Sequence, residues 1–456
     1  MFGKINRFVI NNLWNDKKVD LKFTDNKLII VGENGSGKTT ILRILYETLA
    51  CKWTSLSIEE FESIEIYFTG KKPIVIRRDL IKNGQELFVK LNDSIIRELP
   101  LNIRHLVREK IDIKGRDVSY DEVLELLDEC GYSNNEIYND ISRKINSLEN
   151  TEIKKYTKKI KENLNCSIIY MPTYRRVEKR IGYINEREYK SRAFVGRTRY
   201  NILKTEKSLE IAKTGMDDVK YYIEMRIEDI KRKANISATR LNYQCFKGIL
   251  NKASDDVVYD EKILQAEAIE NVFGSINEDV LSPEESEQIK KSLKNMGTNN
   301  IPESQSYEQI VYYFYHMLYE RYQQIKKDEK VILKFFDACN EYLNNKKFVY
   351  NEKEYSYSIV LKDNGQDKRN IDLESLSSGE KQVVSMFSYL YLSPIDDTLI
   401  LIDEPEMSLS VPWQKKYLVD IVDGISCSGL IAVTHSPFVF DNKLKPFARA
   451  LEEFIL

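Results

Sequence analysis

Long apolar runs are missing from this chain of 456 residues. No stretch approaches the roughly 18 consecutive apolar residues that a membrane-spanning helix needs. Lys4 and Arg7 interrupt the N-terminus where a signal peptide would have its apolar core. An excess of one charge is also missing, because 69 Lys and Arg oppose 71 Asp and Glu and leave a net charge of −2. We therefore predict a cytoplasmic protein without a membrane segment, and a uniformly basic coat for nucleic acid is excluded.

Cysteine, histidine and proline are scarce as well. The 6 cysteines form no CxxC pair, and the 3 histidines have no spacing typical of zinc ligands. Proline occurs 10 times, against 28 tyrosines. These counts predict reduced thiols in place of a disulfide framework, and long elements with aromatic-rich packing.

Strand and helix patterns fill the two ends of the chain. Leu28–Val31 is a continuous apolar run typical of a strand buried on both faces, and Thr40–Ala50 has apolar residues at helical spacing. Three strand patterns, Ile64–Phe68, Pro73–Arg77 and Leu87–Leu91, predict a small antiparallel meander. The capping-box pattern at Ser57–Glu60 predicts a short helix. Strands alternate with helices again near the C-terminus, which indicates a mostly parallel sheet.

A helical middle separates these two ends. Apolar residues recur at helical spacing from Met216 to Ile230, and capping boxes open further helices at Ser282 and Ser306. We predict an α/β fold: a head with a mostly parallel sheet plus an antiparallel β meander, interrupted by a large α-helical insertion. The predicted head comprises 1–102, 166–176 and 346–456, and the insertion comprises 103–165 and 177–345.

A glycine-rich turn follows the first buried strand. Gly32-Glu-Asn-Gly-Ser-Gly37-Lys38-Thr39 fits GxxxxGK[ST] between a strand and a helix, the context that supports this motif. Its glycines let backbone N–H groups point at phosphate oxygens, and the helix that begins near Lys38 adds its positive dipole end. Lys38 is expected to reach the β- and γ-phosphates, and the Thr39 hydroxyl is a candidate ligand for Mg²⁺.

Further polar residues follow the C-terminal strands. One apolar strand ends in Asp403, which suits Mg²⁺, and Glu404, which is placed to polarise an attacking water. Alone, such a pair is also common on protein surfaces. A second buried strand ends in His435, although a lone histidine is usually structural. Ser377–Gln382 opens a helix with a Ser-Ser-Gly turn that is either a second anion-binding device or an ordinary N-cap.

In this order, the four elements resemble those of the ABC-type P-loop ATPases. The LSSGEKQ stretch and the histidine after a strand distinguish that family from other P-loop proteins. The helical insertion is similar to its SMC-like branch, which includes SMC proteins, zinc-hook repair ATPases and ATPases of bacterial anti-phage systems. The absent CxxC hook argues against the repair ATPases, and the few residues after the histidine strand argue against fused nucleases.

Local strings are more closely similar to the ATPase subunits of the PARIS anti-phage system, the AriA family. The strings are GENGSGKTTILRILYETLA at 32–50, YMPTYRR at 170–176, LSSGEKQVVSMFSYLYL at 376–392, DEPEMSLSVPWQ at 403–414 and AVTHSPFVFDN at 432–442. The ATPases of the Septu system, the PtuA family, are a close competitor. This resemblance covers the head, roughly half of the chain.

The family resemblance implies a role for individual residues. ATP and Mg²⁺ would be bound by Gly32, Glu33, Asn34, Gly35, Ser36, Gly37, Lys38, Thr39 and Thr40. A second copy would contact the γ-phosphate through Ser377, Ser378, Gly379 and Glu380. Asp403 would support the metal together with Thr39, and the catalytic residues would be Glu404, which activates water, His435, which senses the γ-phosphate, and Lys38.

Two segments of the family pattern correspond less clearly to residues of this sequence. Met407–Ser410 takes the place of the loop through which two heads contact each other. No clear glutamine loop follows the strand at 166–171, where Tyr174, Arg175 and Arg176 stand. Trp14 is a candidate for stacking on the adenine base.

The resemblance also implies partners. Two heads would face each other with ATP between them, in a homo-oligomer that holds or releases a separately encoded Toprim-type nuclease when a phage protein triggers it. One alternative is an SMC-like ATPase that acts directly on DNA, and another is a stand-alone signalling ATPase. We expect ATPase activity but no nuclease activity in this chain, since no organised acid cluster lies on strands outside the nucleotide site.

A basic cluster at 175–200 contains nine basic side chains against three acidic ones. Its interleaved tyrosines are compatible with a nucleic-acid track, and the alternatives are a solvated helix face or a surface that docks a partner protein. The helices expected near 216–241 and 307–343 have wide apolar stripes, which favour a packed bundle or an oligomer contact over a long two-stranded arm.

Overall fold

A computed structural model describes residues 3–81, 104, 139, 151–173, 208–210, 216–252, 259–276, 281–298, 306–363, 366–393 and 397–456. The chain divides into two compact units. The first comprises Met1–Tyr221 with Ser377–Leu456, and the second comprises Tyr222–Leu376. The first unit therefore unites both ends of the sequence. The segment boundaries predicted from the sequence stay a prediction.

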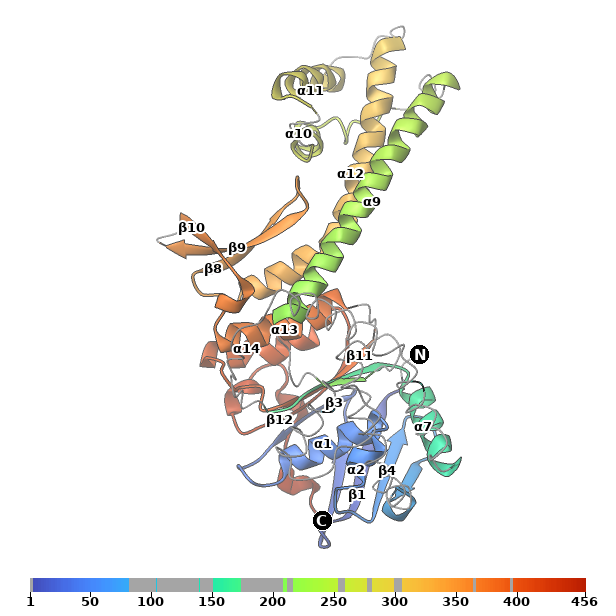
Figure 1. The fold of residues 1–456 in the computed structure, drawn as a ribbon, viewed down its shortest axis with the longest axis vertical. Coiled ribbons are helices and arrows are strands. Elements are labelled where there is room, and N and C mark those ends of the chain that lie inside the picture. The colour runs from blue at the N-terminus through green and yellow to red at the C-terminus, as the bar shows by residue number, and fades with distance from the viewer. Residues whose placement is uncertain are drawn as a thin grey trace. The chain divides into compact units, whose positions relative to one another are not determined.

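A parallel sheet forms the centre of the first unit (Figure 1). Its strands lie in the order β13-β3-β12-β11-β6-β7, and each neighbouring pair is parallel. The strands are β3 (Lys27–Val31), β6 (Ser167–Met171), β7 (Ser208–Glu210), β11 (Thr398–Asp403), β12 (Cys427–Thr434) and β13 (Ala448–Ala450). Every residue of β6 and β11 is buried, as continuous apolar runs predict for parallel strands covered on both faces. The predicted parallel sheet is confirmed.

An antiparallel sheet and the helix α1 cover one face of the parallel sheet. The antiparallel strands are β1 (Ile5–Leu13), β2 (Lys17–Lys22), β4 (Ser63–Phe68) and β5 (Ile74–Arg77), in the order β2-β1-β4-β5. The helix α1 (Lys38–Leu49) has apolar residues on most of its circumference, which is typical of a helix enclosed on several sides. Ile41 and Leu45 of α1 share one core with Phe8 of β1 and Leu401 of β11. The predicted antiparallel pairing of the first two meander strands is confirmed, and the third expected strand, Leu87–Leu91, lies outside the described residues.

The opposite face of the parallel sheet is covered by α13 (Ser378–Leu392) and α14 (Val411–Val422) (Figure 1). Leu399 and Leu401 of β11 belong to the core shared with α1, whereas the buried Ile400 and Ile402 lie outside it. Alternate residues of a strand face opposite sides of the sheet. The strand β11 therefore contributes side chains to the packed layers on both sides. Another helix of this unit, α7 (Thr151–Leu164), lies in the segment predicted to be helical.

One short helix lies a turn earlier than predicted. The helix α2 spans Trp53–Leu56, and Ser57 follows it instead of beginning a new helix. The Ser57 N–H donates to the Trp53 carbonyl at 2.9 Å, which closes α2. Glu59 pairs with Arg43 of α1 at 2.5 Å. The predicted helix at Ser57–Glu60 is wrong because these contacts override the local capping signal.

The second unit combines helices with a small antiparallel sheet. Its helices are α9 (Met216–Leu250, which begins in the first unit), α10 (Ala266–Gly274), α11 (Pro283–Thr298) and α12 (Ser306–Asn340). Its strands are β8 (Lys346–Asn351), β9 (Ser356–Asp363) and β10 (Gln366–Ile371), in the order β10-β9-β8. In the part of the chain that the structure describes, no helix has both the length and the apolar character needed to span a bilayer.

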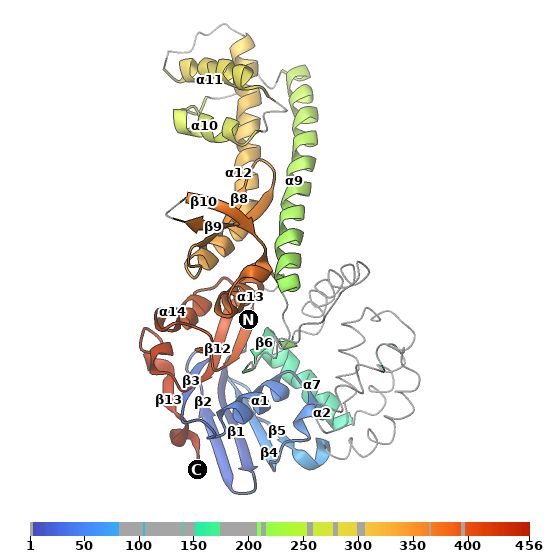
Figure 2. The same cartoon turned by 60° about the vertical axis from the view of Figure 1, so that its left-hand side comes forward.

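The helices α9 and α12 pair in antiparallel fashion within the second unit. Arg226 Nη2 donates to the Asp328 carbonyl at 3.4 Å, and Arg321 Nε donates to Ser237 Oγ at 3.2 Å. Residue numbers therefore rise along α9 as they fall along α12. Figures 1 and 2 show α10 and α11 on the side of α12 away from α9, where their apolar residues share a core with Tyr312 and Tyr315 of α12. On this side the helices form a packed bundle, as the wide apolar stripes predict. The expectation against a long two-stranded arm is wrong for α9 and α12, because these helices of 35 residues each lie side by side as an antiparallel pair.

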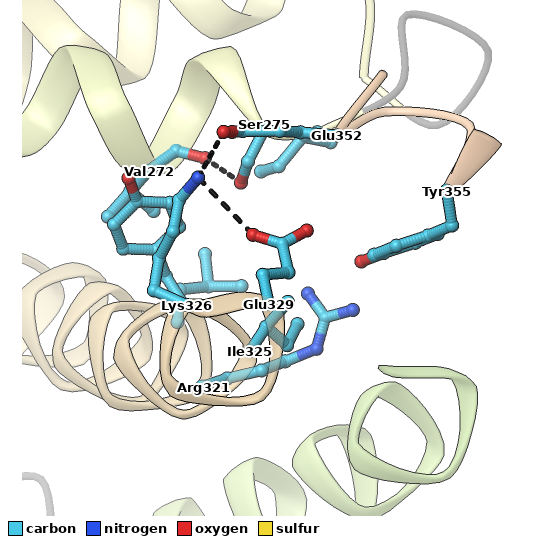
Figure 3. Close-up of a pocket in the computed structure, with 11 residues that line it drawn as sticks. Val272, Ser275, Arg321, Ile325, Lys326, Glu329, Glu352 and Tyr355 are labelled. Carbon is cyan, nitrogen blue, oxygen red and sulfur yellow. Dashed lines mark hydrogen bonds and ion pairs between the residues drawn. The ribbon is translucent and has the colours of Figure 1, made fainter. Parts of the chain in front are cut away.

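A buried carboxylate lies in a small polar cavity of the second unit (Figure 3). Glu329 of α12 is 1% exposed, and its Oε1 accepts a hydrogen bond from the Tyr350 hydroxyl at 3.1 Å. Lys326 Nζ lies 3.3 Å from Glu329 Oε2 and 2.5 Å from Glu352 Oε1. Burial raises the pKa of Glu329 above its ordinary value, Glu352 adds to the rise, and Lys326 opposes it. The carboxyl group therefore holds its proton more firmly in the folded chain.

This raised pKa makes stability depend on pH in a definite direction. Above the ordinary value of 4.5 the unfolded chain releases a proton that the folded chain still binds, so the free energy of unfolding falls as the pH rises through that window. Glu329→Gln keeps an acceptor for Tyr350 but cannot titrate. We expect the free energy of unfolding of this variant, measured with urea, to increase relative to that of the wild type as the pH rises from about 4.5 towards neutrality. Glu354→Gln, at an exposed glutamate that does not contribute to the raised pKa of Glu329, is the control. Parallel pH curves for Glu329→Gln and wild type would contradict the assignment.

Candidate functional site

Four neighbouring parallel strands end at one edge of the sheet in the first unit. The residues that follow them are Gly32 after β3, His435 after β12, Glu404 after β11 and Thr173 close behind β6. The carboxyl ends of parallel strands open onto a common crevice. This edge therefore collects polar side chains from segments that are far apart in the sequence.

The loop after β3 has a conformation that depends on glycine. Gly35 and Gly37 have φ values of 81° and 96°, in the left-handed region that other residues rarely adopt. A Cβ atom at Gly37 would also overlap the ring of Trp14, which packs on the loop. The helix α1 begins directly after Gly37 without a side-chain cap, so its first N–H groups remain available to an anion. The strand–turn–helix context predicted for the motif is present.

Lys38 lies at the centre of the site. Its Nζ donates to the carbonyl oxygens of Gly32 at 2.8 Å and Glu33 at 2.7 Å, and lies 3.9 Å from Glu404 Oε1. Its side chain is 4% exposed. Close by, the Ser36 hydroxyl is buried and has no hydrogen-bond partner among the described residues. The ammonium group thus connects the glycine-rich loop with the end of β11.

Asp403, at the end of β11, contacts the start of α1 and the segment after β6 through its two carboxylate oxygens. Thr39 Oγ1 donates to Oδ1 at 3.2 Å, and Thr173 Oγ1 donates to Oδ2. Asp403 is 3% exposed, and these hydrogen bonds replace part of the hydration that a carboxylate loses on burial. The predicted pair of Thr39 and Asp403 is therefore in contact.

Glu404 and His435 meet at the ends of β11 and β12. His435 Nδ1 lies 2.5 Å from Glu404 Oε2 and 3.0 Å from Glu406 Oε1. Glu406 Oε1 also accepts hydrogen bonds from the Thr434 hydroxyl at 2.6 Å and from the N–H groups of His435 and Ser436, both at 3.0 Å. Glu406 thereby fixes the turn after β11 to the end of β12.

Burial and charge shift the acid–base behaviour of this group. Burial and the neighbouring Glu406 raise the pKa of Glu404 to about 7, against the opposing effect of His435. Glu404 also has a φ of 49°, an uncommon backbone conformation for a residue other than glycine. Ligand atoms of Glu404, Glu406 and His435 lie within 4.8 Å of one another, a spacing that can hold a cation. The carboxyl group of Glu404 is placed to accept a proton near neutral pH.

The segment Ser377–Glu380 begins α13, on the opposite face of the sheet from α1. The Ser377 hydroxyl accepts from the Glu380 N–H at 3.4 Å, while the Ser377 N–H donates to Glu380 Oε2 at 2.7 Å. This is a capping box. A Cβ atom on Gly379 would overlap the carbonyl oxygen of Ser408, so the segment packs directly on Met407–Ser410. The N-cap interpretation is confirmed, and anion binding by the same turn stays a prediction.

The remaining predicted positions are distributed around the loop. Glu33, Asn34, Gly35 and Thr39 are exposed, whereas Ser36 and Thr40 are half-buried. The positions expected to replace the glutamine loop, Tyr174, Arg175 and Arg176, lie outside the described residues, as does the basic cluster at 175–200.

Two residues of the site were missed from the sequence. Thr173 follows Pro172, the first residue after β6. Its contact with Asp403 depends on β6 lying beside β11. Glu406 is the third acid of the DEPE run after β11. Its position in that run indicated that it lies near the site. Nothing in the local sequence indicates that its carboxylate accepts hydrogen bonds from the end of β12.

The side chains present fit a triphosphate with a divalent cation. A lysine ammonium and the N–H groups at the start of α1 complement phosphate oxygens. The Thr39 hydroxyl and the Asp403 carboxylate supply oxygen ligands of the kind that Mg²⁺ prefers. The unpartnered Ser36 hydroxyl adds a polar group inside the same loop.

Comparison with known proteins identifies one family for this chain. The family described as AAA ATPase domain matches residues 4–440. Among curated proteins, none matches the chain. One similar solved structure is the Smc head domain with an extended coiled coil bound to the C-terminal domain of ScpA from Pyrococcus furiosus, at 14% identity and a TM-score of 0.33, covering 96% of this chain and 91% of that one. Another is the Smc head domain with a coiled coil and joint from Pyrococcus yayanosii, at 14% identity and a TM-score of 0.30, covering 96% and 93%.

The two glycines with positive φ provide a matched pair for testing the loop. Gly35→Ala introduces a Cβ into open space, so it adds only backbone strain of about 1–2 kcal/mol. Gly37→Ala adds similar strain and also collides with Trp14. We expect Gly37→Ala to weaken binding of a fluorescent ATP analogue at least about tenfold more than Gly35→Ala does. Equal losses for the two variants would show that the contact with Trp14 does not shape the loop.

Proposed function

The chain belongs to the AAA ATPase domain family, and on that premise we propose that it hydrolyses Mg²⁺-ATP in pockets shared by two facing copies. The observation that carries hydrolysis is the meeting of Lys38 with Glu404, 3.9 Å apart, at the edge where β3 and β11 end. One group complements phosphate charge and the other can accept a proton from water. A purely structural turn does not require the buried Lys38 and the half-buried Glu404 to meet there.

Each polar residue of the site then has a distinct task. Lys38 and the N–H groups of the loop bind the phosphates, and Thr39 and Asp403 hold the metal ion. That ion, when bound, neutralises charge that develops on the phosphate oxygens. Glu404 orients the attacking water and accepts its proton, while His435 positions Glu404 and reaches towards the γ-phosphate.

The placement of Ser377–Gly379 supports a pocket shared by two copies. This turn begins α13 on the face of the sheet opposite α1, and Gly379 is held against Ser408. We infer that the turn completes the pocket of a second copy instead of its own. Such a contact would be isologous, each copy lending its turn to the loop of the other.

The biological role that we propose is that of a sensor and scaffold in anti-phage defence. The support is the similarity of the head to the ATPase subunits of the PARIS system, with the Septu ATPases as the close alternative. In this role the ATP-linked pairing of heads would hold a separately encoded Toprim-type nuclease and release it when a phage protein is detected. An SMC-like ATPase acting directly on DNA remains the alternative function, and no described residue favours it.

Replacing the water-activating acid should separate hydrolysis from pairing. Glu404→Gln is expected to lower the rate of ATP hydrolysis by about 100-fold or more while still binding ATP. The variant should therefore accumulate as a dimer or larger oligomer under saturating Mg²⁺-ATP, measured by light scattering. Lys38→Ala, which removes a phosphate contact, is the control that should remain unpaired.

Complementation between variants tests whether the pocket is shared. Lys38→Ala and Ser378→Arg should each abolish hydrolysis alone, since every pocket then lacks one contributor. A mixture should recover activity, because the loop of the Ser378→Arg copy can face the intact turn of the Lys38→Ala copy. A monomeric Glu404→Gln variant, or a mixture without activity, would refute the shared pocket.

The proposed role in defence predicts a specific bound protein. Full-length Glu404→Gln, isolated from its native host with Mg²⁺-ATP, should retain a Toprim-type nuclease that is identified by mass spectrometry. The nuclease should be depleted from the complex after infection by a phage that carries the trigger. Hydrolysis stimulated by duplex DNA, with no nuclease retained, would instead favour the SMC-like alternative.

A further inference from the structure

The helix α9 has a second apolar face that α12 does not cover. Ala234, Leu241 and Gly248 are buried towards α12, where Gly248 approaches Tyr313 closely. About half a turn around the helix, four apolar side chains are exposed to solvent. They are Ile236 at 51%, Tyr243 at 75%, Phe246 at 66% and Leu250 at 67%. We call these four residues the outer face of α9.

The outer face has the spacing of a helix-binding seam. Ile236, Tyr243 and Leu250 recur every seven residues, and Phe246 lies three residues after Tyr243, as in the a and d positions of a heptad. Figures 1 and 2 show that α10 and α11 lie on the far side of α12, so neither packs on this face. A row of large exposed apolar side chains is unfavourable in water and marks a contact surface.

The charge around the outer face has one sign. Residues 231–252 contain six basic side chains and no acidic one. Arg232 and Lys233 are engaged by Asp229, at 2.6 and 3.1 Å. Arg240 and Lys247, beside the seam, have no ion pair within the described part of the chain. Among the described residues, the surface therefore presents apolar side chains beside basic groups that no ion pair engages.

We propose that the outer face of α9 binds an acidic amphipathic helix of a partner protein. Apolar side chains of that helix would pack on Ile236, Tyr243, Phe246 and Leu250, and its carboxylates would lie opposite Arg240 and Lys247. Helix-in-groove recognition uses this combination of spaced apolar anchors and complementary flanking charge. The inference goes beyond the proposed function, since it requires neither nucleotide nor the pairing of heads.

Charge and side-chain chemistry select this occupant over others. A second α9 would bring six more basic side chains against the first set, which opposes self-pairing. Nucleic acid would satisfy Arg240 and Lys247 but would leave Ile236 and Leu250 exposed at the ends of the seam. An acidic helix satisfies both the apolar and the charged part of the surface.

The test uses two synthetic peptides of about three heptads with the same Leu and Ile seam. One carries Glu at the flanking positions and the other carries Lys. Fluorescence anisotropy with the full chain, without nucleotide, should show the Glu peptide binding at least about tenfold more tightly than the Lys peptide. Tyr243→Ser combined with Phe246→Ser should weaken binding of the Glu peptide about tenfold or more. Val349→Ser, at an exposed apolar residue on β8, is the matched control and should change nothing.

A charge reversal separates this proposal from simple hydrophobic adhesion. Arg240→Glu combined with Lys247→Glu should invert the preference, so that the Lys peptide binds more tightly than the Glu peptide. All four substituted positions on α9 are exposed, and an unchanged thermal melt would verify that each variant folds. Equal binding of the two peptides, no binding of the Glu peptide, or its displacement by duplex DNA would overturn the proposal. Because nucleotide is absent, these outcomes are independent of whether heads pair.

Discussion

The parallel pairing of β3, β12, β11 and β6 is the constraint on which the site depends. Parallel strands end at the same edge of a sheet, so the loop at Gly32–Thr39 and the acids at Asp403 and Glu404 meet although more than half of the chain separates them in sequence. An antiparallel arrangement would send alternate strand ends to opposite edges. The chemistry of the site thus depends first on strand direction, which brings the side chains together, and only then on the identity of each side chain.

Within that arrangement, Glu406 keeps the strand ends in register. One of its oxygens accepts hydrogen bonds from Thr434, His435 and Ser436, which ties the turn after β11 to β12. A carboxylate buried in this way is tolerated because several donors replace its lost hydration. The same negative charge lies close enough to Glu404 to contribute to its raised pKa. Mechanical support and electrostatic tuning therefore come from one residue.

Much of the fold follows from local patterns, and its exceptions have identifiable causes. The runs at β3 and β11 were recognisable because a strand buried on both faces must be apolar throughout. The strand β10 was missed, since Gln366–Ile371 is polar and is held by pairing with β9. The helix expected at Ser57–Glu60 failed because its backbone and side chains are engaged by α2 and α1. Local propensity therefore determined the secondary structure only where tertiary contacts did not oppose it.

The sequence alone determined the loop at Gly32–Thr39 and the acidic end of β11, because both are encoded by consecutive residues whose spacing carries the chemistry. Only the tertiary structure decided that Thr173 reaches Asp403, that Trp14 packs on Gly37, and that one face of α9 is covered while the other is exposed. These contacts join segments that are distant in sequence. Their partners are selected by strand order and helix packing, which no local pattern specifies.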